Sequence, residues 1–281
     1  MNNPVDIKIA HINKSETSNN TLSKELVFEI LSRTNYEALK PHYKFQQLWV
    51  NEAYLTFKDF DTYLLLMYLK NKIFIDYSDR FHYMSVDTFY SQDKIAIDKI
   101  NLIQISKSLN IPKETIRRKI NYMQEKKIIF RSGKSIYLNS KALEIVKPNK
   151  TLPLLSIFFE KISDILSKED WFGNRLKRED IEEFIRNHYT LCWEYFYRFQ
   201  IPYLTRQRNC FADLESWNVW GSIALAQTAA FSEDNQKITR EELTSYEDYW
   251  IALTKFKPKR GINASSISDI STIPRATVIR K

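Results

Sequence analysis

Two segments of this chain, one near the middle and one at the end, carry nearly the same sequence. Residues 100–119 read INLIQISKSLNIPKETIRRK, and residues 262–281 read INASSISDISTIPRATVIRK, with nine identities in 20 positions and no gap. Unrelated segments of this length share roughly one or two identities at ordinary residue frequencies. The match therefore predicts an internal duplication, which restricts the chain to folds that contain two similar units.

The first copy has the spacing of two short helices joined by a tight turn. Apolar residues recur at helical intervals over residues 102–109. Pro112 suits the first turn of a second helix, where its missing N–H needs no partner. An apolar stripe at i, i+4 and i+7 from Ile116 leaves Arg, Thr and Asn on the other sides of that helix. Residues 126–139, KKIIFRSGKSIYLN, then predict a β-hairpin around Ser-Gly.

The positive charge of the chain gathers around these two copies. The net charge is +8. Residues 101–150 hold 12 Lys and Arg against three Asp and Glu, and residues 255–281 hold seven against one. The stretches 1–100 and 151–254 each carry more acidic than basic residues. A basic patch on an otherwise neutral or acidic body is typical of a site for a polyanion.

Composition favours a mainly helical protein without catalytic chemistry. Four glycines in 281 residues disfavour glycine-rich phosphate loops, doubly wound nucleotide-binding sheets and turn-rich all-β folds. Cys192 and Cys210 form no CxxC motif, and the four histidines show no metal-ligand spacing. The sequence has no GxSxG, P-loop or HExxH motif. We therefore expect a protein that is not an enzyme, with no catalytic residues, no metal and no cofactor.

The order of the predicted elements resembles the winged helix-turn-helix of bacterial transcription regulators. The resemblance covers residues 98–140 and part of residues 262–281, and it rests on the run IPKETIRRKI followed by KKIIFRSGKSIYL. It implies a mainly α fold with two winged helix-turn-helix repeats, a small β-hairpin wing and additional packing helices. In such proteins the second helix lies in the DNA major groove, and the wing contacts the backbone or the minor groove.

Carried over to this chain, the resemblance implies DNA-binding residues in the first copy. Arg117 and Arg118 would read guanine edges, and Asn121 would read an adenine edge. Thr115, near the start of the second helix, would hold a phosphate together with backbone N–H groups. Nearby basic side chains would bind the DNA backbone and give the affinity its salt dependence. These basic residues are Lys113, Lys126, Arg131 and Lys134.

In the second copy the implied DNA-binding residues are Arg275, Thr277 and Arg280. Ile279 takes the place of Arg117, so the two copies are expected to read different bases. The sequence ends at Lys281, inside the second predicted recognition helix. Because a helix of about eight residues is marginal without packing partners, we expect a truncated fragment of a natural chain that continues by at least about 20 residues.

The duplication predicts three regions along the chain. Residues 1–20 are a polar, flexible N-terminus without the apolar core of a signal peptide. Residues 21–146 form the first helical and winged helix-turn-helix repeat, and residues 154–281 form the second, truncated repeat. The stretch between them, KPNKTLP at residues 147–153, is the predicted linker.

Further helical features lie outside the duplicated segments. The apolar stretches at residues 59–69 and 213–225 both start with acidic residues and are a weaker sign of the same duplication. From Lys177 an aromatic stripe predicts one long helix that ends at Pro202, and ITREEL at residues 238–243 predicts a capping box. The aromatic cluster favours a core, with a homodimer surface and a small-molecule effector pocket as alternatives. The cluster consists of Trp193, Tyr195, Phe196, Tyr197, Phe199, Trp217 and Trp220.

The longest apolar runs, at residues 63–69 and 152–159, are far shorter than the roughly 18 residues of a membrane span. We therefore expect a cytoplasmic protein without a membrane partner. The favoured function is sequence-specific binding of double-stranded DNA in transcription regulation, with two recognition helices as a built-in pseudo-dimer. One alternative is a plasmid or phage replication initiator with tandem winged helices. The other is a protein-interaction module that binds no DNA.

Overall fold

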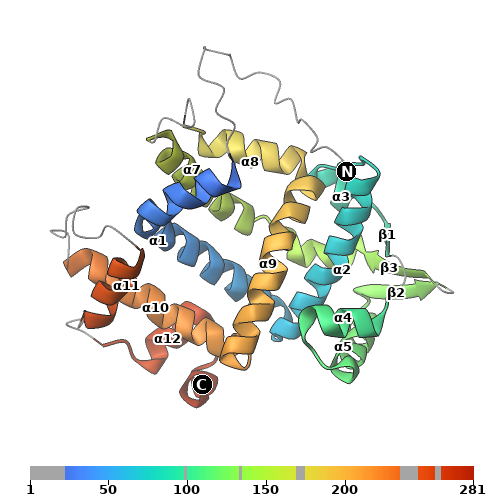
Figure 1. Cartoon of the computed structure of the whole chain (residues 1–281). Coiled ribbons are helices and arrows are strands. Elements are labelled where there is room, and N and C mark those ends of the chain that lie inside the picture. Colours follow the sequence, from blue (N-terminus) through green and yellow to red (C-terminus); the bar gives the residue numbers. More distant parts are fainter. Residues whose placement is uncertain (1–22, 98–99, 133–134, 169–174, 235–245, 257–260) are drawn as a thin grey trace, which may run out of the picture.

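The computed structural model of the chain describes residues 23–97, 100–132, 135–168, 175–234, 246–256 and 261–281. The fold is mainly helical, as the composition predicts, with one small sheet (Figure 1). The helices are α1 (Lys24–Phe57), α2 (Phe60–Asp79), α3 (Val86–Tyr90), α4 (Leu102–Leu109), α5 (Lys113–Glu125), α6 (Ser140–Leu143), the 3-10 turn η1 (Glu144–Val146), α7 (Thr151–Ser167), α8 (Arg178–Asn187), α9 (Tyr189–Phe211), α10 (Leu214–Asp234), α11 (Tyr246–Lys255), α12 (Ala264–Ser271) and α13 (Arg275–Arg280).

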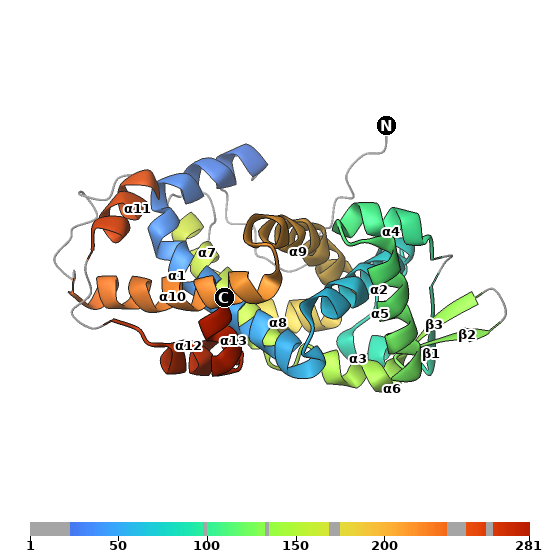
Figure 2. The ribbon, with the colours of Figure 1, turned by 90° about the horizontal axis from the view of Figure 1, so that it is seen from below.

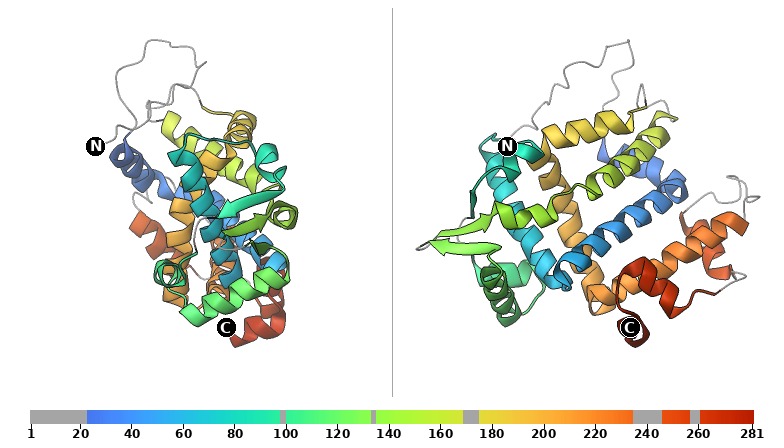
Figure 3. Two further views of the ribbon diagram at one scale, coloured as in Figure 1. Left: turned by 90° about the vertical axis from the view of Figure 1, so that its right-hand side faces the viewer. Right: turned by 180° about the vertical axis from the view of Figure 1, so that it is seen from behind.

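Three antiparallel strands form the sheet, in the order β1-β3-β2. The strands are β1 (Lys94–Ile97), β2 (Ile129–Ser132) and β3 (Ser135–Asn139). On the central strand, Ile136 lies opposite Ile97 of β1 and opposite Arg131 of β2. Since α4 and α5 lie between β1 and β2 in the chain, this region runs strand, helix, helix, strand, strand. The sheet projects at one edge of the molecule, opposite the edge formed by α10 and α11 (Figure 3).

Two helix corners, one in each half of the chain, have the same construction. α1 is joined to α2, and α9 is joined to α10, through one residue with positive φ, Lys58 in the first corner and Ala212 in the second. The next residue is Asp59 or Asp213, whose carboxylate accepts hydrogen bonds from backbone N–H groups of the following helix. These bonds satisfy donors that a helix N-terminus leaves free. The apolar stretches at residues 59–69 and 213–225, which both start with an acidic residue, therefore begin equivalent helices.

The two corners pack crosswise around a shared centre. α2 lies against α9, and α1 lies against α10, with α9 running through the middle of the view in Figure 1. At the centre, the buried amides of Gln46 in α1 and Gln200 in α9 bond reciprocally, Nε2 to Oε1 at 3.0 and 2.7 Å.

The two glutamines occupy equivalent positions of the two corners. They are separated along the chain by the same interval as Asp59 and Asp213, which we call the corner offset. A residue that contacts its own equivalent lies on a symmetry axis. The two corners are therefore arranged like the halves of a symmetric dimer.

The hydrophobic core runs through both corners without a break. Trp49 of α1 stacks on Phe196 of α9, with ring centroids 4.3 Å apart, and lies 6.3 Å from Trp193. These contacts join the predicted regions 21–146 and 154–281. The two regions therefore share one core, and neither of them buries its apolar residues alone.

The aromatic cluster divides between the core and the surface. Its members in the core are Trp193, Tyr197 and Trp217, all three buried, with Phe196 packed against them. The core prediction is confirmed for these side chains. The remaining members are exposed and lie outside the core: Tyr195 at 60%, Phe199 at 50% and Trp220 at 40%.

The predicted helix from Lys177 to Pro202 is wrong at both its middle and its end. His188 leaves helical geometry with φ −115° and ψ 38°, and this break separates α8 from α9. Pro202 lies inside α9 and does not end it. Pro202 is exposed, whereas Ile201 and Leu204 beside it are buried. We infer that this burial outweighs the cost of the missing N–H, about 3 kcal/mol in a helix interior.

Several sequence predictions concern segments at the margins of the described residues. The linker prediction, 147–153, extends too far because α7 already begins at Thr151. The flexible N-terminus, 1–20, and the capping box at 238–243 lie outside the described residues. In the part of the chain that the structure describes, no helix has the length and apolar character needed to cross a membrane.

Candidate nucleic-acid interface

The first duplicated segment folds as two helices, α4 and α5, joined by a short turn. Asn101 begins α4, and its side chain accepts hydrogen bonds from two backbone N–H groups of the first turn. Asn110 ends α4 with φ 51° and ψ 40°, a left-handed conformation that asparagine tolerates. The hydroxyl of Ser106 donates to the carbonyl oxygen of Ile111 at 2.7 Å and so fixes the turn.

The second segment, α12 and α13, has the same features at the equivalent positions. Asn263 caps α12 by accepting from a backbone N–H group, and Thr272 ends it with φ 60°. The hydroxyl of Ser268 donates to the carbonyl oxygen of Ile273, again at 2.7 Å. The prolines that precede α5 and α13 have φ of −53° and −54° and ψ of 138° and 137°. The two segments therefore share one backbone geometry.

The two-helix units, α4–α5 and α12–α13, also bury the same apolar positions against the core. The burial of these positions explains why the identities between the two segments include isoleucines as well as turn residues. The equivalent buried pairs are Ile105 with Ile267, Ile111 with Ile273, and Ile116 with Val278. We call the interval that relates these pairs the segment offset.

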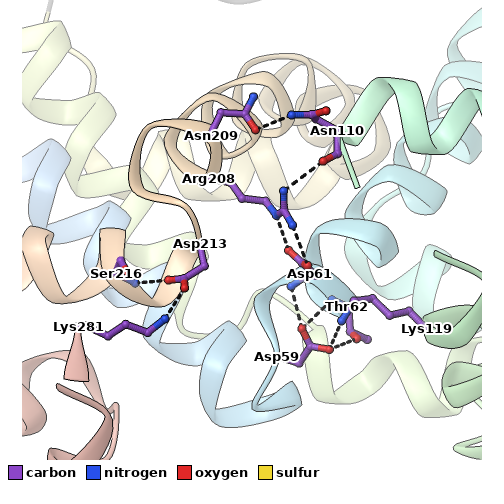
Figure 4. Close-up of polar contacts among 10 residues, drawn as sticks. All are labelled: Asp59, Asp61, Thr62, Asn110, Lys119, Arg208, Asn209, Asp213, Ser216 and Lys281. Atoms are coloured by element: carbon purple, nitrogen blue, oxygen red, sulfur yellow. Dashed lines mark hydrogen bonds and ion pairs between the residues drawn. The ribbon is translucent and has the colours of Figure 1, made fainter. Parts of the chain in front are cut away.

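A lysine at the same position anchors the second helix of each unit. Lys119 of α5 pairs with Asp59 at the start of α2, and Lys281 pairs with Asp213 at the start of α10 (Figure 4). Burial alone would raise the pKa of each aspartate. The hydrogen bonds, first of all from the lysine, outweigh it and hold both pKa values below their usual range. These two lysines therefore serve packing, and the buried Lys119 is not available to a ligand.

The C-terminal end of α9 holds the turn of the first unit. Arg208 donates through Nη1 to the carbonyl oxygen of Asn110 at 3.1 Å, and its Nε lies 2.9 Å from Oδ1 of Asp61 in α2. The side chain of Asn110 donates in turn to Oδ1 of Asn209 at 2.9 Å. Because Asp213 lies just beyond, one short stretch of chain, from the end of α9 to the start of α10, holds both units (Figure 4).

The exposed side of α5 carries most of the predicted contact residues of the first unit. Thr115 is half-buried in the first turn of α5, and Arg131 is exposed on β2. Lys134 lies outside the described residues. Arg117 forms an ion pair with Glu114 at 3.0 Å, and since both side chains are more than half exposed this pair contributes little stability. The exposed residues along α5 and at its end are Lys113, Arg117, Arg118, Asn121 and Lys126.

The second unit presents a different surface at the same positions. Arg275 and Arg280 are exposed on α13, and Thr277 is half-buried. The guanidinium of Arg280 folds back on its own helix and donates to the hydroxyl of Thr277 at 3.1 Å. Ile279, which is 62% exposed, stands where the first unit has Arg117. The two units therefore share a backbone and differ in the chemistry of their exposed faces.

Both units lie on the same side of the molecule. In Figure 1 they occupy the lower side, and the views of Figure 3 agree. Seen from below, α4 and α5 lie to one side and α12 and α13 to the other, with α2 and α9 between them (Figure 2). A single extended ligand along this side could therefore meet both exposed helices.

The described residues hold no group of three or more His, Cys, Asp and Glu side chains that could bind a metal ion. Cys192 and Cys210 are both free thiols. Comparison with protein-family models, with curated proteins and with solved structures gives no match.

Sequence reasoning missed the residues that attach the two units to the rest of the fold. Asp59 and Asp213 were visible only as acidic starts of apolar stretches, and the paired amides of Gln46 and Gln200 were not singled out. The signal was the corner offset, which aligns Phe-Gln with Phe-Gln and Asp-Phe-Asp with Asp-Leu-Glu. The corner offset is shorter than the segment offset that relates α4–α5 to α12–α13, so one ungapped comparison cannot find both.

Proposed function

We propose that this chain binds double-stranded DNA with two helix-turn-helix units, α4–α5 and α12–α13, in sequence-specific regulation of transcription. The observation that carries the proposal is the matched geometry of the two units on one side of the molecule, each with an exposed, basic second helix. A pair of equivalent helices on one face is the arrangement that dimeric helix-turn-helix proteins use on two half-sites. Here one chain supplies both helices.

The first unit would be a winged helix-turn-helix. The strand order β1-β3-β2, with two helices between β1 and β2, supports this assignment, because the β2–β3 hairpin then stands beside α5 as a wing. In this arrangement α5 enters the major groove, and Arg131 on β2 contacts the DNA backbone. The second unit would insert α13 in the same way.

The exposed residues divide into readers of bases and holders of phosphates. Arg117 and Arg118 suit guanine O6 and N7, and Asn121 suits an adenine edge. Lys113 and Arg275, at the starts of α5 and α13, suit phosphates and give sequence-independent affinity. On binding, two arginines would exchange a contact within the chain for a contact with DNA. Arg117 would break its ion pair with Glu114, and Arg280 would break its hydrogen bond with Thr277.

The two units would read unequal half-sites. Ile279 offers an apolar contact, such as the methyl group of thymine, where the first unit offers the guanidinium of Arg117. The bound sequence would therefore be an imperfect inverted repeat or two unrelated half-sites. Because both units are held by one stretch at the end of α9 and the start of α10, their spacing on DNA would be fixed. We expect about one helical turn, the usual half-site spacing of dimeric helix-turn-helix proteins.

The test is selection of bound duplexes from a random pool with the full chain. We expect two enriched blocks at a constant spacing. Asn121→Ala should relax the choice of base at one position in one block only and cost about 1–3 kcal/mol of binding free energy at that site. Arg80→Ala, on the exposed end of α2, is the matched control and should leave the selected sequence unchanged. Enrichment of a single block, or of none, would contradict the proposal.

The same selected sequence decides between regulator and replication initiator. Single copies near promoters would favour transcription regulation, and several tandem copies would favour a replication origin. If the chain binds no DNA even at low salt, the helix-turn-helix units are protein-docking modules. In that case replacement of Arg117, Arg118 and Lys134 by Ala should leave binding to the protein partner unaffected by salt.

A further inference from the structure

A cavity of about 430 Å³ lies between α2, α9 and the end of α4. This volume falls in the range of small-molecule sites in proteins. Ser108 of α4 and Asn209 of α9 both line it, and Asn209 is the residue that accepts a hydrogen bond from Asn110 in the turn of the first unit. The cavity therefore lies directly behind the first helix-turn-helix.

Two of the residues that line the cavity each hold a polar atom that is buried and has no hydrogen-bond partner among the described residues. These atoms are Oδ1 of Asn71 in α2 and Oγ1 of Thr205 in α9. Since buried polar atoms in folded proteins are nearly always satisfied, the packing of α2 and α9 beside the cavity is incomplete.

The equivalent position in the other half of the molecule is closed by protein. There Asn51 of α1 donates through Nδ2 to the carbonyl oxygen of Ile270, near the end of α12, at 2.6 Å. The corner offset makes Thr205 the equivalent of Asn51, and the segment offset makes Ser108 the equivalent of Ile270. In this half both equivalents line the cavity. A contact that one half makes within the chain is thus absent from the other, and an open space takes its place.

The chemistry of the cavity wall defines what could fill it. Arg206 lines the cavity, is exposed at its edge, and has no ion pair with any described residue. Arg198 also lines it but is held by Glu194. Tyr68, Ile201 and Pro202 supply an apolar wall. A cation beside an apolar wall and the hydroxyl of Ser108 suits an amphipathic anion that also carries a hydrogen-bond donor.

We propose that this cavity is a binding site for a small organic anion. The anion's carboxylate or phosphate binds Arg206, its apolar body lies against Ile201 and Pro202, and its donor bonds the hydroxyl of Ser108. The occupant then completes the contact between α4 and α9 that Asn51 makes in the other half. Filling the site makes the packing of α4 against α9 more rigid, whether or not the chain binds DNA.

The test measures binding to the full chain by calorimetry, without DNA. The carboxylate probe is 4-hydroxyphenylacetate and the phosphate probe is adenosine monophosphate, because each combines an anion with a flat apolar body and a donor. Their neutral counterparts are 4-hydroxyphenylacetamide and adenosine. We expect one of the two anions to bind saturably and its neutral counterpart to bind at least about tenfold more weakly. Binding by one arm alone identifies the anionic group, and binding by neither anion overturns the proposal.

Two variants test whether the anion occupies this cavity. Arg206→Gln removes the cation, and Thr205→Asn rebuilds the closing side chain of the other half. Each variant should weaken binding of the anion at least about tenfold. Arg80→Gln, at the far end of α2, should leave the affinity unchanged. The melting temperature of each unliganded variant shows that it folds. Undiminished binding to folded Arg206→Gln or Thr205→Asn overturns the proposal.

Hydrogen exchange gives an independent measure of the more rigid packing of α4 against α9. The bound anion should slow amide exchange in residues 102–110 and leave residues 264–272, the equivalent segment of the other half, unchanged. Equal slowing in both segments would mean that the anion stabilises the whole fold from elsewhere, and that result overturns the proposal.

Discussion

Replacing Lys70 with methionine should remove most of the pH dependence of folding stability between about pH 7 and pH 9. Lys70 lies in α2 at the centre of the fold and is 2% exposed. Its ammonium lies 3.1 Å from the hydroxyl of Tyr90 and 3.2 Å from that of Tyr189, with the ring centroids of Tyr90 and Phe74 5.4 and 5.8 Å away. Desolvation by burial lowers the pKa of Lys70 from 10.5 to about 7.

The sign of the effect follows from proton binding. Between the folded and the unfolded pKa of Lys70, the unfolded chain holds a proton that the folded chain has lost. The free energy of unfolding therefore rises with pH across this window. The full slope is about 1.4 kcal/mol per pH unit, so the gain between pH 7 and pH 9 is on the order of 2 to 3 kcal/mol. Burial raises the pKa of Tyr63 and Tyr90, which adds an opposite slope only above about pH 10.

The assay is urea unfolding of the wild type and of Lys70→Met at several pH values between 6 and 9. Methionine has a similar length and no charge, and the hydroxyls of Tyr90 and Tyr189, 3.2 Å apart, still bond each other. The wild type should gain stability as the pH rises from 7 to 9, and the variant should stay nearly flat over that range. Below pH 7 both proteins should share a smaller rise with pH from His42, whose pKa burial lowers to about 4, and the variant should be the more stable of the two near pH 6. A flat wild type, or an unchanged slope in the variant, would refute the reasoning.

Three further predictions follow from buried or anchored groups. Asp59→Asn should cost about 1 kcal/mol of folding stability after solvent screening. Because the pKa of Asp59 is lowered in the folded chain, its contribution is present above the unfolded pKa and is lost as the pH falls through the folded pKa. The variant should therefore converge with the wild type in acid unfolding curves. Gln46→Leu should cost about 1–3 kcal/mol by leaving the amide of Gln200 unpaired. Adding Gln200→Leu should recover part of that loss, and strictly additive costs would count against the reciprocal pair. Cys210, which is exposed, should react with a thiol reagent at neutral pH much faster than Cys192, whose pKa burial raises to about 11; equal rates would contradict this difference.

The local elements could be predicted wherever sequence spacing and side-chain chemistry agreed. The two duplicated segments show apolar residues at helical spacing, a proline at the start of the second helix and an asparagine at the start of the first. Each of these features acts within a few residues, so the sequence alone locates α4, α5, α12 and α13. The hairpin strands β2 and β3 followed from their β-prone runs for the same reason.

The long helices could not be predicted in detail because tertiary contacts decide them. Pro202 is a local stop signal, yet α9 continues through it with buried residues on both sides. The break at His188 leaves the apolar stripe of the sequence uninterrupted, so periodicity does not mark it. The mounting pairs Lys119–Asp59 and Lys281–Asp213 join residues far apart in the sequence, and no local pattern encodes such a contact.

The crosswise packing of the two halves was hidden by a difference in spacing. The helix corners repeat at the corner offset, and the duplicated segments repeat at the longer segment offset. The stretch between the corner and the duplicated segment is therefore longer in the second half, which carries α11 where the first half carries α3 and β1. Only contacts in space, above all those of Lys119 with Asp59 and of Lys281 with Asp213, show that both offsets belong to one arrangement.

The most direct test of the central claim is a DNA-binding titration of the full chain at two salt concentrations, against a duplex selected from genomic fragments and a random duplex. We predict tight binding that weakens steeply with salt and a clear preference for the selected duplex. Combining Arg117→Ala with Arg118→Ala should lose that preference, and Arg280→Ala should weaken it in part. Equal affinity for both duplexes, or full affinity after removal of Arg117, Arg118 and Arg280 together, would contradict a function built on two recognition helices.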